Sequence, residues 1–215
     1  MSPALLDRLE FLSSQCVPQL IAGLMVCETL LLVVSSHHVA IPVFLVQRSI
    51  LTILLWPTIG LLLTRMTAVA LGAVALIYCV TLWRLRHATK EGAKSAGPLG
   101  SVPFRLVAAC LGMLLVHGLV RTYSSAALPF SITLAAVSLV LNGLLVILIG
   151  GSGQRAGLGV LVLADAGRLL YAFSRADALV WGLWNACDVM VALGASYLHS
   201  VRVATRDGPP GEASE

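Results

Sequence analysis

The sequence predicts an all-α protein, a polytopic bundle of about seven transmembrane helices. Of its 215 residues, 58% are hydrophobic and only 11% are charged, whereas a soluble domain usually carries about 25% charged residues. The mean hydropathy is +0.93. A membrane-spanning helix needs roughly 20 apolar residues. Seven spans with short connections therefore account for nearly the whole chain, and the lipid bilayer is its expected solvent.

Seven apolar stretches define the expected spans. They cover residues 17–35, 39–63, 66–83, 104–120, 128–150, 156–173 and 177–201. Residues 1–16 repeat leucines at near-helical spacing beside charged residues, which predicts an N-terminal interfacial segment. The polar stretch 84–103 contains Gly, Pro, Ser and Lys, so we expect a loop between helices 1–3 (17–83) and helices 4–7 (104–201). Residues 202–215 are polar and contain proline, which predicts a disordered C-terminal tail.

The distribution of Lys and Arg predicts the orientation, because basic residues are retained on the cytoplasmic side of a membrane. With the 84–103 loop inside, the inner basic residues are Arg84, Arg86, Lys90, Lys94, Arg155, Arg202 and Arg206, and the outer ones are Arg8, Arg65, Arg121 and Arg175. We therefore expect an integral protein of the cytoplasmic (inner) membrane, with its N-terminus outside and its C-terminus inside.

The other polar features of the sequence do not indicate a nucleic-acid-binding, metal-binding or catalytic site. The net charge of +4 comes from residues at span ends, not from a basic stripe with aromatics, so lipid and not nucleic acid is the expected partner. The cysteines lack CxxC spacing and are expected to be packing residues without a metal: Cys16, Cys27, Cys79, Cys110 and Cys187. His37 and His38 form a pair in a loop at a membrane edge, where we expect a solvated or pH-responsive pair and not a metal site. No catalytic motif, haem pair or iron–sulfur cluster is visible, so we expect no catalytic centre and no cofactor.

Ionisable side chains in the middle of a span are costly unless they are paired, so each is a candidate functional residue. Five such residues are found in four spans: Glu28, Arg48, Asp165, Arg168 and Asp188. Arg105 and His117 lie nearer the span ends, where a long side chain can reach the interface.

Spacing predicts some of the partners of these groups. Asp165 and Arg168 are three residues apart on one helix face, which predicts an ion pair. Asp188 has no opposite charge within one turn of its own helix, so it must face another helix or be protonated. Two candidates remain for further polar contacts: Asn142 and Asn185 can extend a polar track between helices, and Glu28 can neutralise Arg48 in the next helix.

Three stretches carry a resemblance to a known class of proteins. The first begins at Asn142 and reads NGLLVILIGGSGQRAGLGVLVLADAGRLLYAF, the second begins at Ala178 and reads ALVWGLWNACDVMVALGASYLHSVRVA, and the third, FLVQRSILTILL, lies in the second span. They resemble the E component of formate-hydrogenlyase-type (hydrogenase-4-like) membrane hydrogenases and the related subunit K of NADH:quinone oxidoreductase. Asp188 matches the acid of the last helix in those families. The chain departs from their pattern at Ala164 and Gly182, where acids are expected.

The resemblance implies an accessory, non-redox membrane subunit of a multi-subunit, proton-translocating oxidoreductase complex. Its partners would include antiporter-like membrane subunits, and Asp165 and Asp188 would carry or shape a buried proton path. Two alternatives remain open. In a small autonomous transporter or sensor, Glu28, Arg48 and Asp188 would line a substrate cavity, whereas in a scaffold or assembly subunit the charges would only pair.

Overall fold

The computed structural model describes residues 16–34, 36–88, 102–123, 128–150, 152–174 and 177–206. It is all-helical, as expected, and its described part contains six helices, α2 (Cys16–Val33), α3 (His37–Ala88), α4 (Val102–Tyr123), α5 (Phe130–Ile149), α6 (Gly153–Ser174) and α7 (Ala178–Arg206). The predicted interfacial segment, most of the predicted 84–103 loop and the end of the predicted tail lie outside the described residues.

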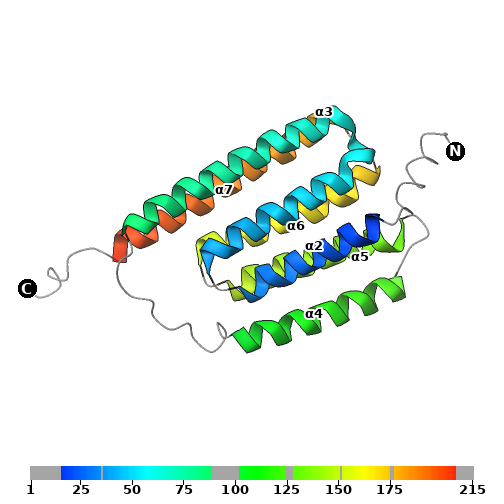
Figure 1. Ribbon diagram of the computed structural model, residues 1–215, viewed down its shortest axis with the longest axis horizontal. Coiled ribbons are helices and arrows are strands. Elements are labelled where there is room, and N and C mark those ends of the chain that lie inside the picture. The colour runs from blue at the N-terminus through cyan, green and yellow to red at the C-terminus, as the bar shows by residue number, and fades with distance from the viewer. Residues whose placement is uncertain are drawn as a thin grey trace, which may run out of the picture.

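Helix α3 consists of two helical segments joined at Gly60. This glycine has φ 75° and ψ 173°, a conformation outside the helical region that side chains with a Cβ rarely adopt. At this point the chain folds back, so that residues 61–88 run in the direction opposite to residues 37–59 (Figure 1). The predicted second and third spans correspond to these segments, and the sharp turn replaces the short connection that we expected near residues 64–65.

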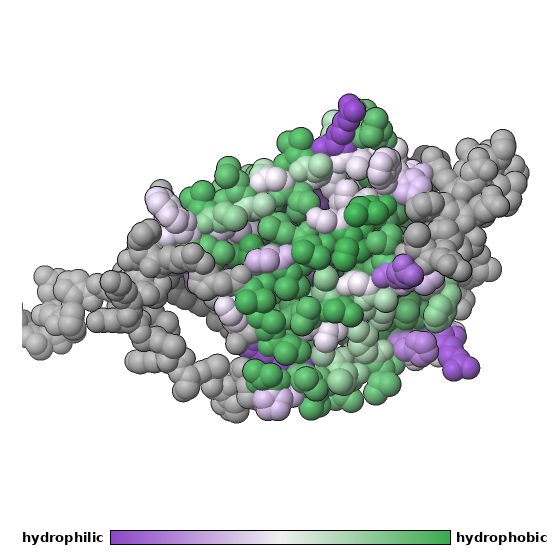
Figure 2. Space-filling model, viewed as in Figure 1, coloured by the Kyte–Doolittle hydropathy of each residue, from purple (hydrophilic) through white to green (hydrophobic). Residues whose placement is uncertain are grey.

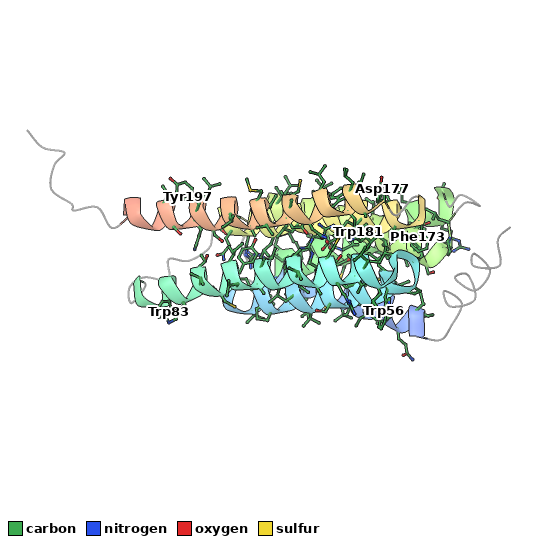
Figure 3. The ribbon with its side chains drawn as sticks, turned by 90° about the horizontal axis from the view of Figure 1, so that it is seen from above. Trp56, Trp83, Phe173, Asp177, Trp181 and Tyr197 are labelled. Carbon is green, nitrogen blue, oxygen red and sulfur yellow. The ribbon has the colours of Figure 1, made fainter. Side chains whose placement is uncertain are left out.

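The helices form two layers of three, with α4 at the edge of the bundle (Figures 1 and 3). One layer contains α2 and the two segments of α3, and the other contains α5, α6 and α7. The order is the same in both, so that α2 packs on α5, residues 37–59 face α6, and residues 61–88 face α7. Polar side-chain contacts join each facing pair, among them Glu28 with Asn142, Arg48 with Asp165, and Thr67 with Trp181, at separations of 114, 117 and 114 residues.

The outer surface of the bundle is apolar. In the described part of the chain, five helices are long and apolar enough to cross a membrane, namely α3, α4, α5, α6 and α7, whereas Val17–Val33 in α2 is a shorter apolar helix. Hydrophobic side chains cover most of one face, and the strongly hydrophilic ones lie mainly toward its ends (Figure 2). This pattern is that of an integral membrane protein.

Exposed aromatic residues lie toward the two ends of the bundle. Trp56 is near one end, and Trp83 and Tyr197 are near the other (Figure 3). Their exposed fractions are 54%, 65% and 69%. Tryptophan and tyrosine are enriched at the two membrane–water interfaces, where an apolar ring with a polar edge is most stable. The two groups therefore mark the expected interface levels.

Two helices are longer than the predicted spans. Helix α3 continues to Ala88, so residues 84–88 of the predicted loop are helical, and α7 continues to Arg206, five residues into the predicted tail. Both extensions are at the end of the bundle where the C-terminus lies (Figure 1).

Candidate functional site

Four charged side chains meet in the core, between the second and third helices of each layer. They are Arg48 from α3, Asp165 and Arg168 from α6, and Asp188 from α7, and each has a side chain that is no more than 3% exposed. We call these four residues the charge network. It unites four of the five ionisable residues that the sequence placed in mid-span.

Arg48 makes the most extensive contacts of the network. Its Nε donates to both carboxylate oxygens of Asp165, at 3.0 and 3.2 Å, and its Nη2 donates to Oδ1 of Asp165 at 2.8 Å. The same Nη2 donates to Oδ2 of Asp188 at 2.5 Å. The planar guanidinium suits this arrangement because it presents several donors in a fixed geometry. Arg48 therefore links α3 to both α6 and α7.

Arg168 completes the network from the other side. Its Nη2 donates to Oδ2 of Asp188, and its Nη1 lies 3.4 Å from Oδ1 of Asp165. The predicted pair of Asp165 and Arg168 is therefore confirmed, although Asp165 makes its shorter contacts with Arg48. The prediction that Asp188 faces another helix is also confirmed, since its partners come from α3 and α6.

The network is neutral in total, because two guanidinium groups face two carboxylates. Aromatic rings flank both cations: the guanidinium carbon of Arg48 is 5.5 Å from the Phe44 ring centroid, and that of Arg168 is 5.9 Å from the Trp184 ring centroid. Such cation–π contacts help to compensate the desolvation of buried cations.

Two polar atoms of the network have no hydrogen-bond partner among the residues that the structure describes. They are Nε of Arg168 and Oδ1 of Asp188. Buried polar atoms in folded proteins nearly always have a partner, which is ordered water where protein groups are lacking. Asp188 thus keeps one carboxylate oxygen that can accept a proton or a water molecule while the other oxygen remains paired with both arginines.

A second polar cluster joins α2 to α5. Both Ser138 Oγ and Asn142 Nδ2 donate to Oε2 of Glu28, the latter at 2.8 Å, while Oε1 of Glu28 has no partner. Glu28 is 1% exposed. The hypothesis that Glu28 neutralises Arg48 is wrong, because Arg48 pairs with the two aspartates and Glu28 contacts only neutral groups.

Of the two asparagines predicted to extend a polar track between helices, only Asn142 makes a side-chain hydrogen bond to another helix within the described residues. Asn142 belongs to the Glu28 cluster, whereas Asn185 is 7% exposed and neither of its side-chain polar atoms has a partner. The two amides lie in different parts of the bundle, since α5 and α7 are at opposite edges of one layer (Figure 1).

The structure adds buried polar residues that the sequence analysis did not single out. Gln47, Tyr78, Gln154 and Ser196 are each no more than 7% exposed, and each has at least one unpartnered side-chain polar atom. Tyr78 is within electrostatic range of both Arg48 and Asp188. A Cβ atom added to Gly157 would lie 3.7 Å from the Tyr78 hydroxyl oxygen, so this hydroxyl also lies beside α6.

These residues extend from the charge network toward one end of the bundle. Gln154 is the second residue of α6, and Gly157 packs against Ala195, which precedes Ser196 in α7. The start of α6 and the end of α7 lie at the end of the bundle that holds the C-terminus (Figure 1). The only sequence signal for this group would have been uncharged polar residues inside apolar spans, which is weak because hydroxyl and amide groups are common there.

Two other arginines have a structural role. Arg105 and Arg155 both donate to the carbonyl oxygen of Val34, the former at 3.5 Å. Val34 directly follows α2, where backbone carbonyls have no partner within the helix and the dipole favours cations. His117, the other residue predicted near a span end, packs edge-on against Phe130.

Within the described ranges, no group of three or more His, Cys, Asp or Glu residues is arranged to hold a metal ion. Cys27, Cys79, Cys110 and Cys187 are free thiols. The side chains of Cys16, His37 and His38 lie outside the described part of the chain.

Comparison with protein-family models, curated proteins and solved structures finds no match to this chain. The class is therefore defined by the fold and the site alone. The chain is an all-helical protein of the membrane-spanning type, with a buried, neutral network of two arginines and two aspartates at its core.

Proposed function

We propose that this chain is an accessory membrane subunit of a multi-subunit, proton-translocating complex, and that its charge network is a station for proton transfer. The observation that carries the proposal is the state of Asp188. One of its oxygens is held by Arg48 and Arg168, and the other is buried and has no partner among the described residues. A carboxylate placed at bilayer depth with a free oxygen is suited to exchange a proton without leaving its site.

The buried polar residues that lead away from Asp188 support a route for the proton. Tyr78, Gln154 and Ser196 have unpartnered polar atoms between the network and the end of the bundle that holds the C-terminus. Hydroxyl and amide groups of this kind bind water in otherwise apolar interiors. We infer a hydrated route from that end to Asp188, along the facing surfaces of α3, α6 and α7.

The proposal includes seven membrane crossings. The apolar part of α3, Val39–Trp83, has 45 residues. At 1.5 Å per residue it would measure about 68 Å if it were straight, roughly twice the hydrocarbon thickness of a bilayer. Two crossings joined at Gly60, together with α2 and the four remaining helices, give seven. With the N-terminus outside, the proposed route opens to the cytoplasm.

A scaffold without proton transfer is the second candidate, and the charge balance of the network favours it. Two cations and two anions that neutralise each other can serve to position three helices. The resemblance to energy-converting complexes would then reflect assembly alone.

The test is proton transfer in membrane vesicles that contain the whole complex. Asp188→Asn removes the titratable group, and Asp177→Asn provides the matched control, because Asp177 is an exposed acid just before the same helix. We expect vesicle acidification, followed with a pH-sensitive dye, to be lost for Asp188→Asn and retained for Asp177→Asn. Normal acidification by an assembled Asp188→Asn complex would instead support the scaffold.

A further inference from the structure

The outer surface of α3 and α7 contains an apolar groove with one buried polar group. Its volume is about 500 Å³, and it lies between residues 62–73 of α3 and 182–189 of α7. The walls include four small residues, Ala70, Ala73, Gly182 and Ala186, and nothing lies within 4 Å of a Cβ atom added to Gly182. Asn185 also lines the groove.

Asn185 indicates that the groove binds another molecule. It is more than nine-tenths buried, yet within the part of the chain that the structure describes neither its side-chain oxygen nor its nitrogen has a hydrogen-bond partner. It lies seven residues inside α7, which places it about 10 Å from the helix start at 1.5 Å per residue. That depth is below the headgroups, where water is scarce and an unpaired amide is costly.

We infer that this groove is the docking site for a transmembrane helix of another subunit, and that the docked helix places a hydrogen-bonding side chain against Asn185. Small residues on two neighbouring helices let a third backbone approach closely, and one hydrogen bond to the Asn185 side-chain amide then fixes the depth of the docked helix. The inference rests on the proposed function, because it assigns the surface through which this chain joins its complex.

Two other possible occupants, a lipid acyl chain and a second copy of this chain, fit the groove less well. A lipid acyl chain fills the groove but offers no hydrogen bond to Asn185. A second copy of this chain, related by a two-fold axis along the membrane normal, would bring the exposed Arg65 of each copy to the same depth at one interface. Like charges there repel, whereas a different subunit can present an acid to Arg65.

The groove lies close to the charge network, so docking there bears on the proposed proton transfer. Asn185 and Asp188 are three residues apart in α7, so they lie within one turn of each other. The docked helix therefore packs beside the proposed proton station, and its polar side chain approaches the network from the outside of the bundle. A polar side chain of the neighbouring subunit then lies beside Asp188 in the plane of the membrane.

Photo-crosslinking in native membranes tests the inference. We would place a benzophenone amino acid at Ala186 in the groove and, as a matched control, at Leu148, which is 78% exposed on α5. The expected result is one adduct of defined mass from position 186, identified by mass spectrometry as a peptide of a different membrane protein, and none of that mass from position 148. Lipid adducts alone, or an adduct of two copies of this chain, would overturn the inference.

A substitution provides the second measurement. Asn185→Leu keeps a similar volume but removes the amide, and Cys187→Leu is the control at an exposed position of the same helix. We expect Asn185→Leu to be lost from the high-mass complex in mild detergent, while Cys187→Leu stays in it. Full assembly of Asn185→Leu would contradict the role of the amide. Failure of the docking site leaves the acidification result for Asp188→Asn unchanged, so the two proposals are tested separately.

Discussion

Arg48 and Asp165 lie 117 residues apart in the chain and face each other across the two layers of the bundle, where Nε and Nη2 of the arginine both bond to the carboxylate. This contact joins the halves of the chain on either side of the long polar segment. Because Asp188 and Arg168 bond to the same group of charges, the orientation of three helices depends on one neutral network.

The first prediction concerns the charge balance of this network. Asp165→Asn leaves two buried guanidinium groups with one carboxylate, and removing one partner of a buried pair typically costs about 3–5 kcal/mol. Arg48→Gln together with Asp165→Asn restores neutrality, so we expect the double variant to be more stable than either single variant. The measurement is thermal unfolding in detergent, reported by the reactivity of the buried Cys27 thiol in a chain that keeps only this cysteine.

The same charge balance applies to Asp188, whose cationic partners both lie on other helices. Since Asp188 is paired with both arginines, Asp188→Asn also leaves a net positive charge in the core. We therefore expect both single variants to be destabilised. If the stability losses of Arg48→Gln and Asp165→Asn simply add in the double variant, the two groups are not coupled as the structure indicates.

The sequence predicted the fold class, most of the helices, the residues of the charge network and the pair of Asp165 with Arg168, but not the central position of Arg48 in the network. Ionisable side chains in the middle of apolar spans stand out in the sequence because they are costly to bury. Their position within the span therefore identified Arg48, Asp165 and Asp188. Depth does not reveal which neighbour a side chain faces, because these helices are apolar around most of their circumference. Glu28 was consequently assigned to the wrong partner. The turn at Gly60 was missed because one glycine in an apolar run carries little signal.

The second prediction concerns Glu28. A buried carboxyl group without a cation is less costly to bury in its neutral form, and the neutral acid is closely matched by an amide. We expect Glu28→Gln to change the free energy of unfolding by no more than about 1 kcal/mol. Glu28→Ala should cost about 2–4 kcal/mol, because it leaves a cavity and removes the partner of Ser138 and Asn142. A large loss for Glu28→Gln in the Cys27 assay would show that the charged form is required.

The third prediction concerns the turn in α3. Any residue that replaces Gly60 must adopt its positive φ, and for a residue with a Cβ atom this conformation costs of order 1–3 kcal/mol. Gly72→Ala is the matched control, because Gly72 lies within the helix and no atom lies within 4 Å of the added Cβ. We expect Gly60→Ala to lower the unfolding temperature and Gly72→Ala to leave it unchanged or raise it. Equal behaviour of the two variants would argue against the turn.

The fourth prediction concerns orientation. In a chain whose native cysteines are replaced, Ser95→Cys lies in the proposed cytoplasmic segment and Ser125→Cys lies in a segment proposed to be outside. A membrane-impermeant maleimide added to intact cells should label position 125 and should reach position 95 only after permeabilisation. The reverse pattern would contradict the proposed topology, in which most of the basic residues lie on the cytoplasmic side.

The most direct test of the proton-transfer proposal uses a variant that removes Asp188 without leaving an unpaired charge. Arg168→Gln together with Asp188→Asn keeps the core neutral, and the bonds between Arg48 and Asp165 remain. The measurement is the number of protons moved per catalytic turnover of the assembled complex in vesicles, with turnover as the internal control. The proposal predicts an assembled complex that turns over while proton movement falls at least tenfold; proton movement at the wild-type ratio would contradict it.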